Sequence, residues 1–171
     1  MSHDWHDFYI LLGTASAALV ALLFVAASIG TGLISAQRST ATRTYMSPII
    51  FHYTFVLFVS LMGLVPDMTD QALAAIITVV ALAGIGFSIV VLIGVFHSAA
   101  SDIADRFGYG GSPLAAYATA LVAAGFLFAH SAVGPNVLAG ALVLLLLVNI
   151  RNAWDLTITF VQRHTDRKPL G

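Results

Sequence analysis

Residues 142–155 of this 171-residue chain read LVLLLLVNIRNAWD, an apolar run that leads directly into amide and charged side chains. The polar residues of this stretch are Asn149, Arg151, Asn152 and Asp155. A charge at the middle of a bilayer costs on the order of several kcal/mol, so a helix retains such groups where they are paired, reach the interface or take part in function. The stretch therefore predicts a membrane helix with partnered polar groups, and the other apolar segments are expected to surround it.

The composition is that of a membrane protein. Hydrophobic residues make up 59% of the chain and charged residues 9%, and the mean hydropathy is +0.94, far from the balance of soluble domains. The sequence contains neither Cys nor Glu, which excludes disulfides, thiol chemistry and metal sites built on those residues. The net charge of −1, without a basic run, gives no indication of nucleic-acid binding. We expect no metal site and no enzymatic activity.

Five apolar segments are separated by polar loops or by Gly- and Pro-containing turns. The second segment is expected to begin as a helix at Ser47–Pro48, because proline suits the first turn of a helix. We therefore predict an all-α, polytopic membrane helical bundle in which residues 1–171 form a single domain. The predicted spans are about 8–34, 48–65, 72–98, 113–132 and 137–160.

The distribution of loop charges predicts the orientation. Cytoplasmic loops carry an excess of Lys and Arg, and the turn that contains Asp67 and Asp70 carries none. The N-terminus is therefore expected outside and the C-terminus in the cytoplasm, with Trp5, Tyr9 and Trp154 as aromatic anchors at the headgroup level. The basic residues on the predicted cytoplasmic side are Arg38, Arg43, Arg106, Arg163, Arg167 and Lys168.

The small residues Gly13, Ala17 and Ala21 recur every fourth position of the first apolar segment. Small side chains at this spacing allow a neighbouring helix to approach closely. We expect such faces to be the means by which the protein associates, either with itself or with another membrane protein.

The polar stretch in the last segment has two interpretations. Counted along the helix from the outer side, Asn149 is about 18 Å deep and Asp155 about 27 Å deep. Arg151 extends to the cytoplasmic headgroups or pairs with Asp155 four residues later. Asn149, Asn152 and Asp155 are expected to lie roughly on one face, where they either join helices within one protomer or line a pore at a subunit junction.

Two histidines are candidate cofactor ligands. His52 lies about 6 Å from the expected cytoplasmic start of its span, and His97 lies near the same level on the next span. Two histidines at one level are what a haem or a chlorophyll-type pigment requires, while bonds to backbone, water or headgroups are the alternative. No titratable side chain is expected at the midplane, which argues against a proton relay.

Four short segments resemble a widespread set of bacterial inner-membrane proteins of uncharacterised function. They are residues 5–9 (WHDFY), 13–19 (GTASAAL), 22–28 (LLFVAAS) and 150–156 (IRNAWDL). The resemblance implies a bacterial cytoplasmic membrane protein and supplies no catalytic residues. We expect a non-enzymatic protein in the lipid bilayer, either homo-oligomeric or an accessory subunit. The alternatives are a small-solute channel at a subunit junction and a haem- or pigment-binding subunit.

Overall fold

A computed structural model describes residues 5–31, 39–97 and 107–165, and all secondary structure in these ranges is helical. Five α-helices are present there, and a short π-helical segment, η3, precedes the fourth. In chain order the elements are α1 (His6–Thr31), α2 (Ser39–Gly63), α3 (Asp70–His97), η3 (Phe107–Gly111), α5 (Ser112–Phe128) and α6 (Gly134–Thr165).

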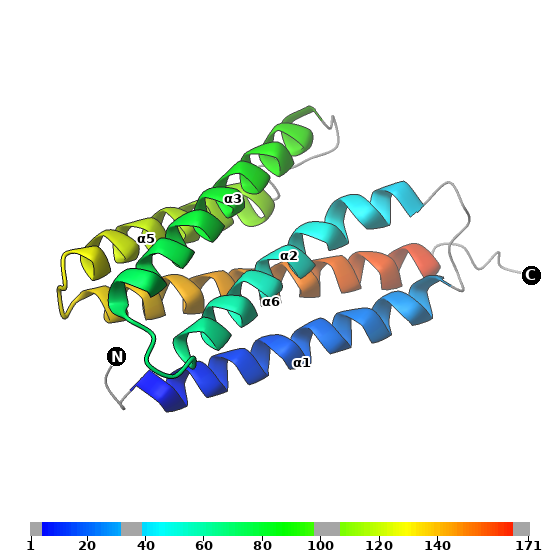
Figure 1. Ribbon diagram of the computed structural model, residues 1–171. Helices are drawn as coiled ribbons and strands as arrows, with labels where there is room; N and C mark the ends of the chain where they lie inside the picture. Colours follow the sequence, from blue (N-terminus) through cyan, green and yellow to red (C-terminus); the bar gives the residue numbers. More distant parts are fainter. Residues whose placement is uncertain (1–4, 32–38, 98–106, 166–171) are drawn as a thin grey trace, which may run out of the picture.

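The helices run lengthwise beside one another and alternate in direction (Figure 1). The start of α1, the α2–α3 turn and the α5–α6 turn lie at one end of the bundle, which we call the N-terminal end. The most extensive helix pairs are α3 with α5, α5 with α6, and α1 with α2, and α6 also packs against α2. The bundle thus has α2 and α6 between α1 on one side and the α3–α5 pair on the other.

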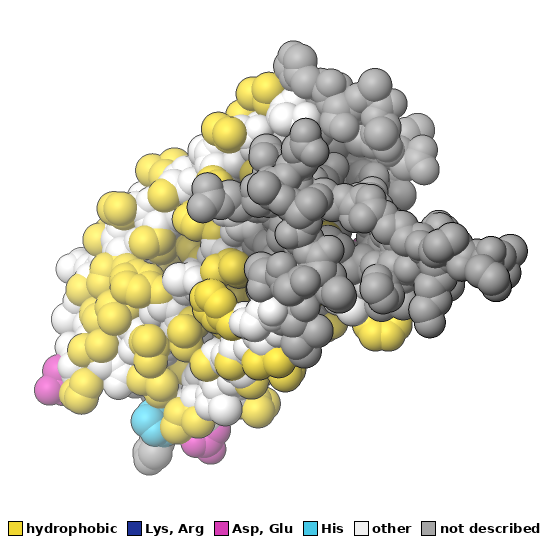
Figure 2. Space-filling model, turned by 90° about the vertical axis from the view of Figure 1, so that its right-hand side faces the viewer, with side chains coloured by type: hydrophobic (Ala, Val, Ile, Leu, Met, Phe, Trp, Pro, Cys, Tyr) yellow, Lys and Arg dark blue, Asp and Glu magenta, His cyan; other side chains and the backbone are white. Residues whose placement is uncertain are grey.

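Apolar side chains occupy both the interior and the exterior of the bundle. Leu11, Val79 and Val90 are 71%, 68% and 67% exposed although each belongs to a long apolar helix. Figure 2 shows hydrophobic side chains over most of the described surface in that view, with acidic and histidine side chains at its lower edge. A surface this apolar is unlike that of a soluble monomer, where exposed apolar patches are limited.

Three helices are long and apolar enough to cross a membrane. They include His6–Ala26 of α1, Asp70–Gly94 of α3 and Gly134–Ile158 of α6. The apolar parts of the other two, Ser47–Gly63 and Ser112–Phe128, are shorter. The all-helical class predicted from the sequence is confirmed. Three of the five predicted apolar segments correspond to helices that are long enough to cross a membrane.

The second helix differs from the prediction at its start. We expected it to begin at Ser47–Pro48, but α2 begins at Ser39 and contains Pro48 in its interior. Proline in a helix interior removes one backbone hydrogen bond, and here the polar segment before it is helical nevertheless. Hydropathy thus identified the apolar part of α2 and not the whole helix.

The face of α1 that contacts α2 includes Gly13 and Ser16 and leaves out two of the three small residues of the predicted face. A Cβ on Gly13 would lie 3.3 Å from the Cβ of Ser60, and the hydroxyl of Ser16 donates a hydrogen bond of 2.7 Å to the carbonyl oxygen of Tyr53. Ala17 and Ala21 are exposed. Of the three predicted small residues, only Gly13 therefore lies against a neighbouring helix in the protomer.

Gly84 on α3 lies directly against the ring of Tyr117 on α5. A Cβ at position 84 would overlap that ring, and Tyr117 is fully buried, so the ring has no solvent-facing space into which it can move. The missing side chain of Gly84 is thus what allows α3 and α5 to pack this closely.

The variant Gly84→Ala should lower the free energy of unfolding by about 1–3 kcal/mol, because an added methyl group in a packed interior forces neighbouring atoms apart. The matched control is Gly86→Ala, where a Cβ would meet nothing within 4 Å. Unfolding of both variants is measured in mixed micelles titrated with sodium dodecyl sulfate. Equal stability of the two variants would contradict the described α3–α5 contact.

Candidate functional site

Polar side chains are buried across the middle of the bundle. The larger of two hydrophobic clusters contains Leu12 on α1 and Leu145 on α6, and the smaller contains Leu23 on α1 and Leu156 on α6. Between these clusters, α1, α2 and α6 carry polar residues that are at most 2% exposed. We call this group the polar layer; it consists of Ser16, His52, Asn149 and Asn152.

His52 joins α2 to α5. Its Nδ1 and the hydroxyl of Tyr117 share a hydrogen bond of 2.7 Å, and both residues are buried. The bond satisfies two polar groups that would otherwise be costly to bury in an apolar interior. It connects residues 65 positions apart in the sequence.

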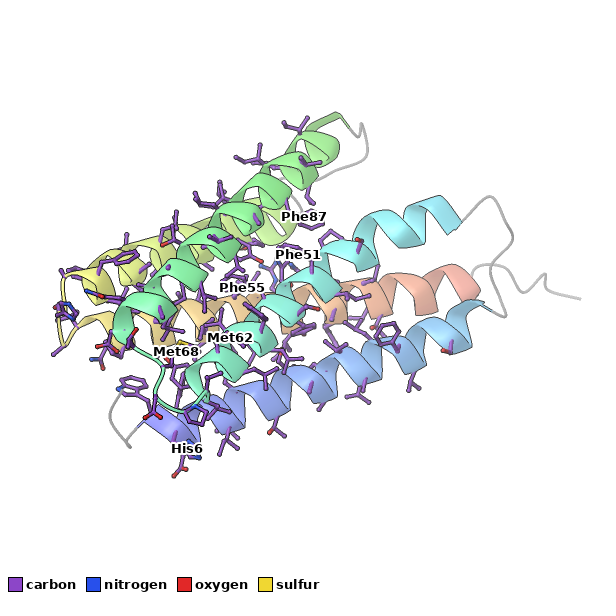
Figure 3. The ribbon with its side chains drawn as sticks, in the orientation of Figure 1. His6, Phe51, Phe55, Met62, Met68 and Phe87 are labelled. Atoms are coloured by element: carbon purple, nitrogen blue, oxygen red, sulfur yellow. The ribbon has the colours of Figure 1, made fainter. Side chains whose placement is uncertain are left out.

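Aromatic rings surround the His52–Tyr117 pair. The ring of Phe55 stands edge-on to Tyr117 at 4.8 Å between centroids, and Phe51 packs on Phe87 of α3 at 4.5 Å. Figure 3 shows Phe51 and Phe87 between α2 and α3. This arrangement is a packed aromatic core that fixes the imidazole on several sides.

The two histidines do not lie at one level. His52 is near the middle of α2, whereas His97 is the last residue of α3. The ring of His52 lies 6.3 Å from that of Phe87 on α3, and His97 is ten residues further along α3, a rise of about 15 Å. The apolar part of α2 begins at Ser47, so the expected depth of His52 in the membrane stays a prediction. The side chain of His97 lies outside the described residues, and the engaged His52 does not favour a two-histidine haem site.

Asn152 joins α6 to η3. Its side-chain Nδ2 donates a hydrogen bond of 2.8 Å to the carbonyl oxygen of Gly108, which also accepts a hydrogen bond of 3.3 Å from the hydroxyl of Ser112. η3 is also held from the other side, because a Cβ on Gly110 would overlap Leu92 of α3. This hydrogen bond is made within one protomer.

The charged half of the predicted polar cluster faces outward. The Nε of Arg151 lies 3.8 Å from a carboxylate oxygen of Asp155, and their side chains are 64% and 49% exposed. Asn149 and Asn152 are buried, so the expected common face of Asn149, Asn152 and Asp155 is divided into an inner amide pair and an outer ion pair. A single ring of these residues around a pore does not fit this division.

Asn149 is the exception among the buried amides. Its side chain is 0% exposed, yet neither its Nδ2 nor its Oδ1 has a hydrogen-bond partner in the protein. It lies one turn before Asn152 on the buried face of α6. It is thus a polar group held inside the bundle at a free-energy cost.

The three expected aromatic anchors have different positions. Trp154 is 64% exposed and Trp5 is half-buried against Phe8. Tyr9, however, is completely buried, because Gly63 leaves room for its ring: a Cβ on Gly63 would lie 3.0 Å from it. The prediction of Tyr9 as a headgroup anchor is therefore wrong; it is a core residue of the α1–α2 contact.

Several residues of the site carry no signal in the sequence. Tyr117, Ser16 and Gly108 are ordinary constituents of apolar helices and glycine turns, and their partners are distant in the chain. Only the unusual depth of the amides on α6 is apparent from the sequence. Among the described residues, no group of three or more metal-ligating side chains lies close enough to hold an ion.

Comparisons of the chain with protein-family models, with curated proteins and with solved structures find no match. The functional conclusions below therefore depend on the sequence and the geometry of the bundle.

The variant Tyr117→Phe should lower the free energy of unfolding by about 1–3 kcal/mol, because it leaves the Nδ1 of buried His52 without a partner. Tyr9→Phe is the matched control: Tyr9 is equally buried, but its hydroxyl makes no hydrogen bond. Its removal should leave stability unchanged or raise it. Unfolding in detergent mixtures measures both, and a larger loss for Tyr9→Phe would contradict the role given to Tyr117.

The variant Asn152→Leu should lower the free energy of unfolding by about 1–3 kcal/mol, because the buried hydrogen bond that joins α6 to η3 is lost. Asp155→Asn removes the exposed ion pair with Arg151 and should change stability by less than about 0.5 kcal/mol, since exposed pairs contribute little. The same unfolding assay compares them. The reverse order of the two effects would indicate that α6 is rotated relative to the described structure.

Proposed function

We propose that this chain is a non-enzymatic integral membrane protein that serves as an accessory or assembly subunit or forms a homo-oligomer. The observation that carries the proposal is the outward-facing apolar surface of α1, α3 and α6, each of which contains a segment long enough for a bilayer. Lipid tails are the environment in which such a surface costs nothing. The resemblance to short bacterial inner-membrane proteins leads us to assign it to the bacterial cytoplasmic membrane.

The buried polar groups support a structural role. The Ser16–Tyr53 bond joins α1 to α2, and the Asn152–Gly108 bond joins α6 to η3. Each of these bonds is made between elements of one protomer, as the His52–Tyr117 bond is. Polar side chains in membrane helices commonly contribute to helix association in this manner.

The orientation that we propose has the N-terminal end of the bundle outside. Asp67, Asp70 and Asn136 belong to the turns and first helical turns at that end. Arg43 and Arg163 lie in the parts of α2 and α6 at the opposite end. This distribution agrees with the excess of basic residues in cytoplasmic segments.

For association we propose the α1 face that carries Ala17 and Ala21. Both residues are exposed in the protomer, and small side chains one turn apart permit a second helix to approach closely. The partner is either a second copy of this chain or another membrane helix.

The orientation is tested by cysteine labelling. The parent sequence contains no cysteine, so only the introduced cysteine can react. Asn136→Cys is in the exposed first turn of α6, and Arg167→Cys is at a position that follows α6 in the sequence, outside the described residues. The reagent is a membrane-impermeant maleimide applied to spheroplasts. We expect Asn136→Cys to be labelled directly and Arg167→Cys to react only after permeabilisation. The opposite pattern would reverse the proposed orientation, and labelling of both would contradict membrane insertion.

The association face is tested by oxidative cross-linking in membranes. Ala21→Cys should give a disulfide-linked dimer if two copies meet at this face. Ala26→Cys is the control, because Ala26 is also exposed on α1 but points about 140° away from Ala21 around the helix. A dimer with Ala26→Cys alone would place the interface elsewhere, and a dimer with neither would leave a different protein as the partner.

A further inference from the structure

The buried amide of Asn149 is closed off from every exterior partner. The residue is 0% exposed, so neither lipid headgroups nor a second protein chain reach it while the bundle is intact. Its Oδ1 and Nδ2 nevertheless lack hydrogen bonds from the protein. Any group that satisfies this amide must therefore be small enough to occupy the interior of one protomer.

The position of Asn149 brings it near α2. α6 packs against α2, and the smaller hydrophobic cluster combines Ile49 and Tyr53 of α2 with Leu156, while Leu146 and Ala153 of α6 pack against it. Leu146 and Ala153 lie three residues before and four after Asn149, so this cluster, which also includes Leu23 of α1, extends along α6 on both sides of the amide.

A second polar group in this region is also unsatisfied. Tyr53 is fully buried, and its hydroxyl has no hydrogen-bond partner in the protein. A buried water typically makes two to four hydrogen bonds to polar groups that are otherwise unsatisfied. The amide of Asn149 supplies a donor and an acceptor, and the hydroxyl of Tyr53 supplies either.

We propose that Asn149 binds an internal water molecule between α6 and α2, with the hydroxyl of Tyr53 as a further ligand of that water. The water joins α6 to α2 in the same way that direct hydrogen bonds join α2 to α5 and α6 to η3. The amide of Asn149 and the hydroxyl of Tyr53 then have a hydrogen-bond partner, which offsets the free-energy cost of burying them. This proposal does not depend on the oligomeric state or on the accessory role proposed above.

The test is nuclear magnetic resonance of the full-length protein in deuterated micelles, with ¹⁵N introduced only in asparagine. The chain has three asparagines, Asn136, Asn149 and Asn152, so three side-chain amide groups are observed. The side-chain amide signal that disappears in Asn136→Ser belongs to Asn136. A second signal is assigned in the same way with Asn149→Leu or Asn152→Leu, and the third follows by elimination. Rotating-frame water cross peaks are recorded at mildly acidic pH, where the sign of the peak separates dipolar contact from proton exchange.

We expect a dipolar cross peak between water and the Asn149 amide, whereas exposed Asn136 should show only the weak contact of fast-exchanging solvent. The peak should persist in Tyr53→Phe, which removes the hydroxyl proton that is able to relay such a signal. Absence of a dipolar peak at Asn149 would overturn the proposal and establish a dry, unsatisfied amide. Complete loss of the peak in Tyr53→Phe would also overturn the claim that Asn149 holds the water, because either the signal belonged to the tyrosine hydroxyl or no water stays at Asn149 without that hydroxyl.

Discussion

A polar group in an apolar interior needs a hydrogen-bond partner, and this requirement governs the whole bundle. The hydrogen bond between His52 and Tyr117 meets it for two buried side chains. The two residues meet at 2.7 Å inside a set of aromatic rings. Tyr117 reaches this position only because Gly84 leaves space for its ring. One hydrogen bond thus fixes the rotation of α2 and α5 about their axes, and with it the face that α3 presents to α5.

The same constraint explains why the core has two hydrophobic clusters instead of one. The polar layer interrupts the apolar stripe of α1 at Ser16 and that of α6 at Asn149 and Asn152. Apolar packing alone permits helices to slide or rotate at small cost, whereas these hydrogen bonds are satisfied in one register. We interpret the layer as the element that specifies this arrangement, while the surrounding leucines, valines and alanines provide the contact area.

The sequence predicted the fold class well and the site only in part. Long apolar segments without charges identify helices from composition alone, and α3 was expected within two residues of its observed ends. The start of α2 was missed because a helix continues through a polar segment that hydropathy does not mark. Asn149 and Asn152 were recognised by their depth, but their separation from Asp155 depends on how α6 is rotated, which the packing of all its neighbours decides. Tyr117 could not be predicted as the partner of His52, because no local sequence pattern connects residues 65 positions apart.

The most direct test of the account is a double-mutant cycle between His52→Phe and Tyr117→Phe, because both replacements keep an aromatic ring of similar size. Each single variant leaves one buried polar atom without a partner and should be less stable than the parent protein. The double variant removes both atoms, and replacing both partners of a buried hydrogen bond by apolar groups is nearly neutral. The double variant should therefore be more stable than either single variant. Additive losses in the double variant would contradict a direct bond between the two side chains and the central place that it has in this structure.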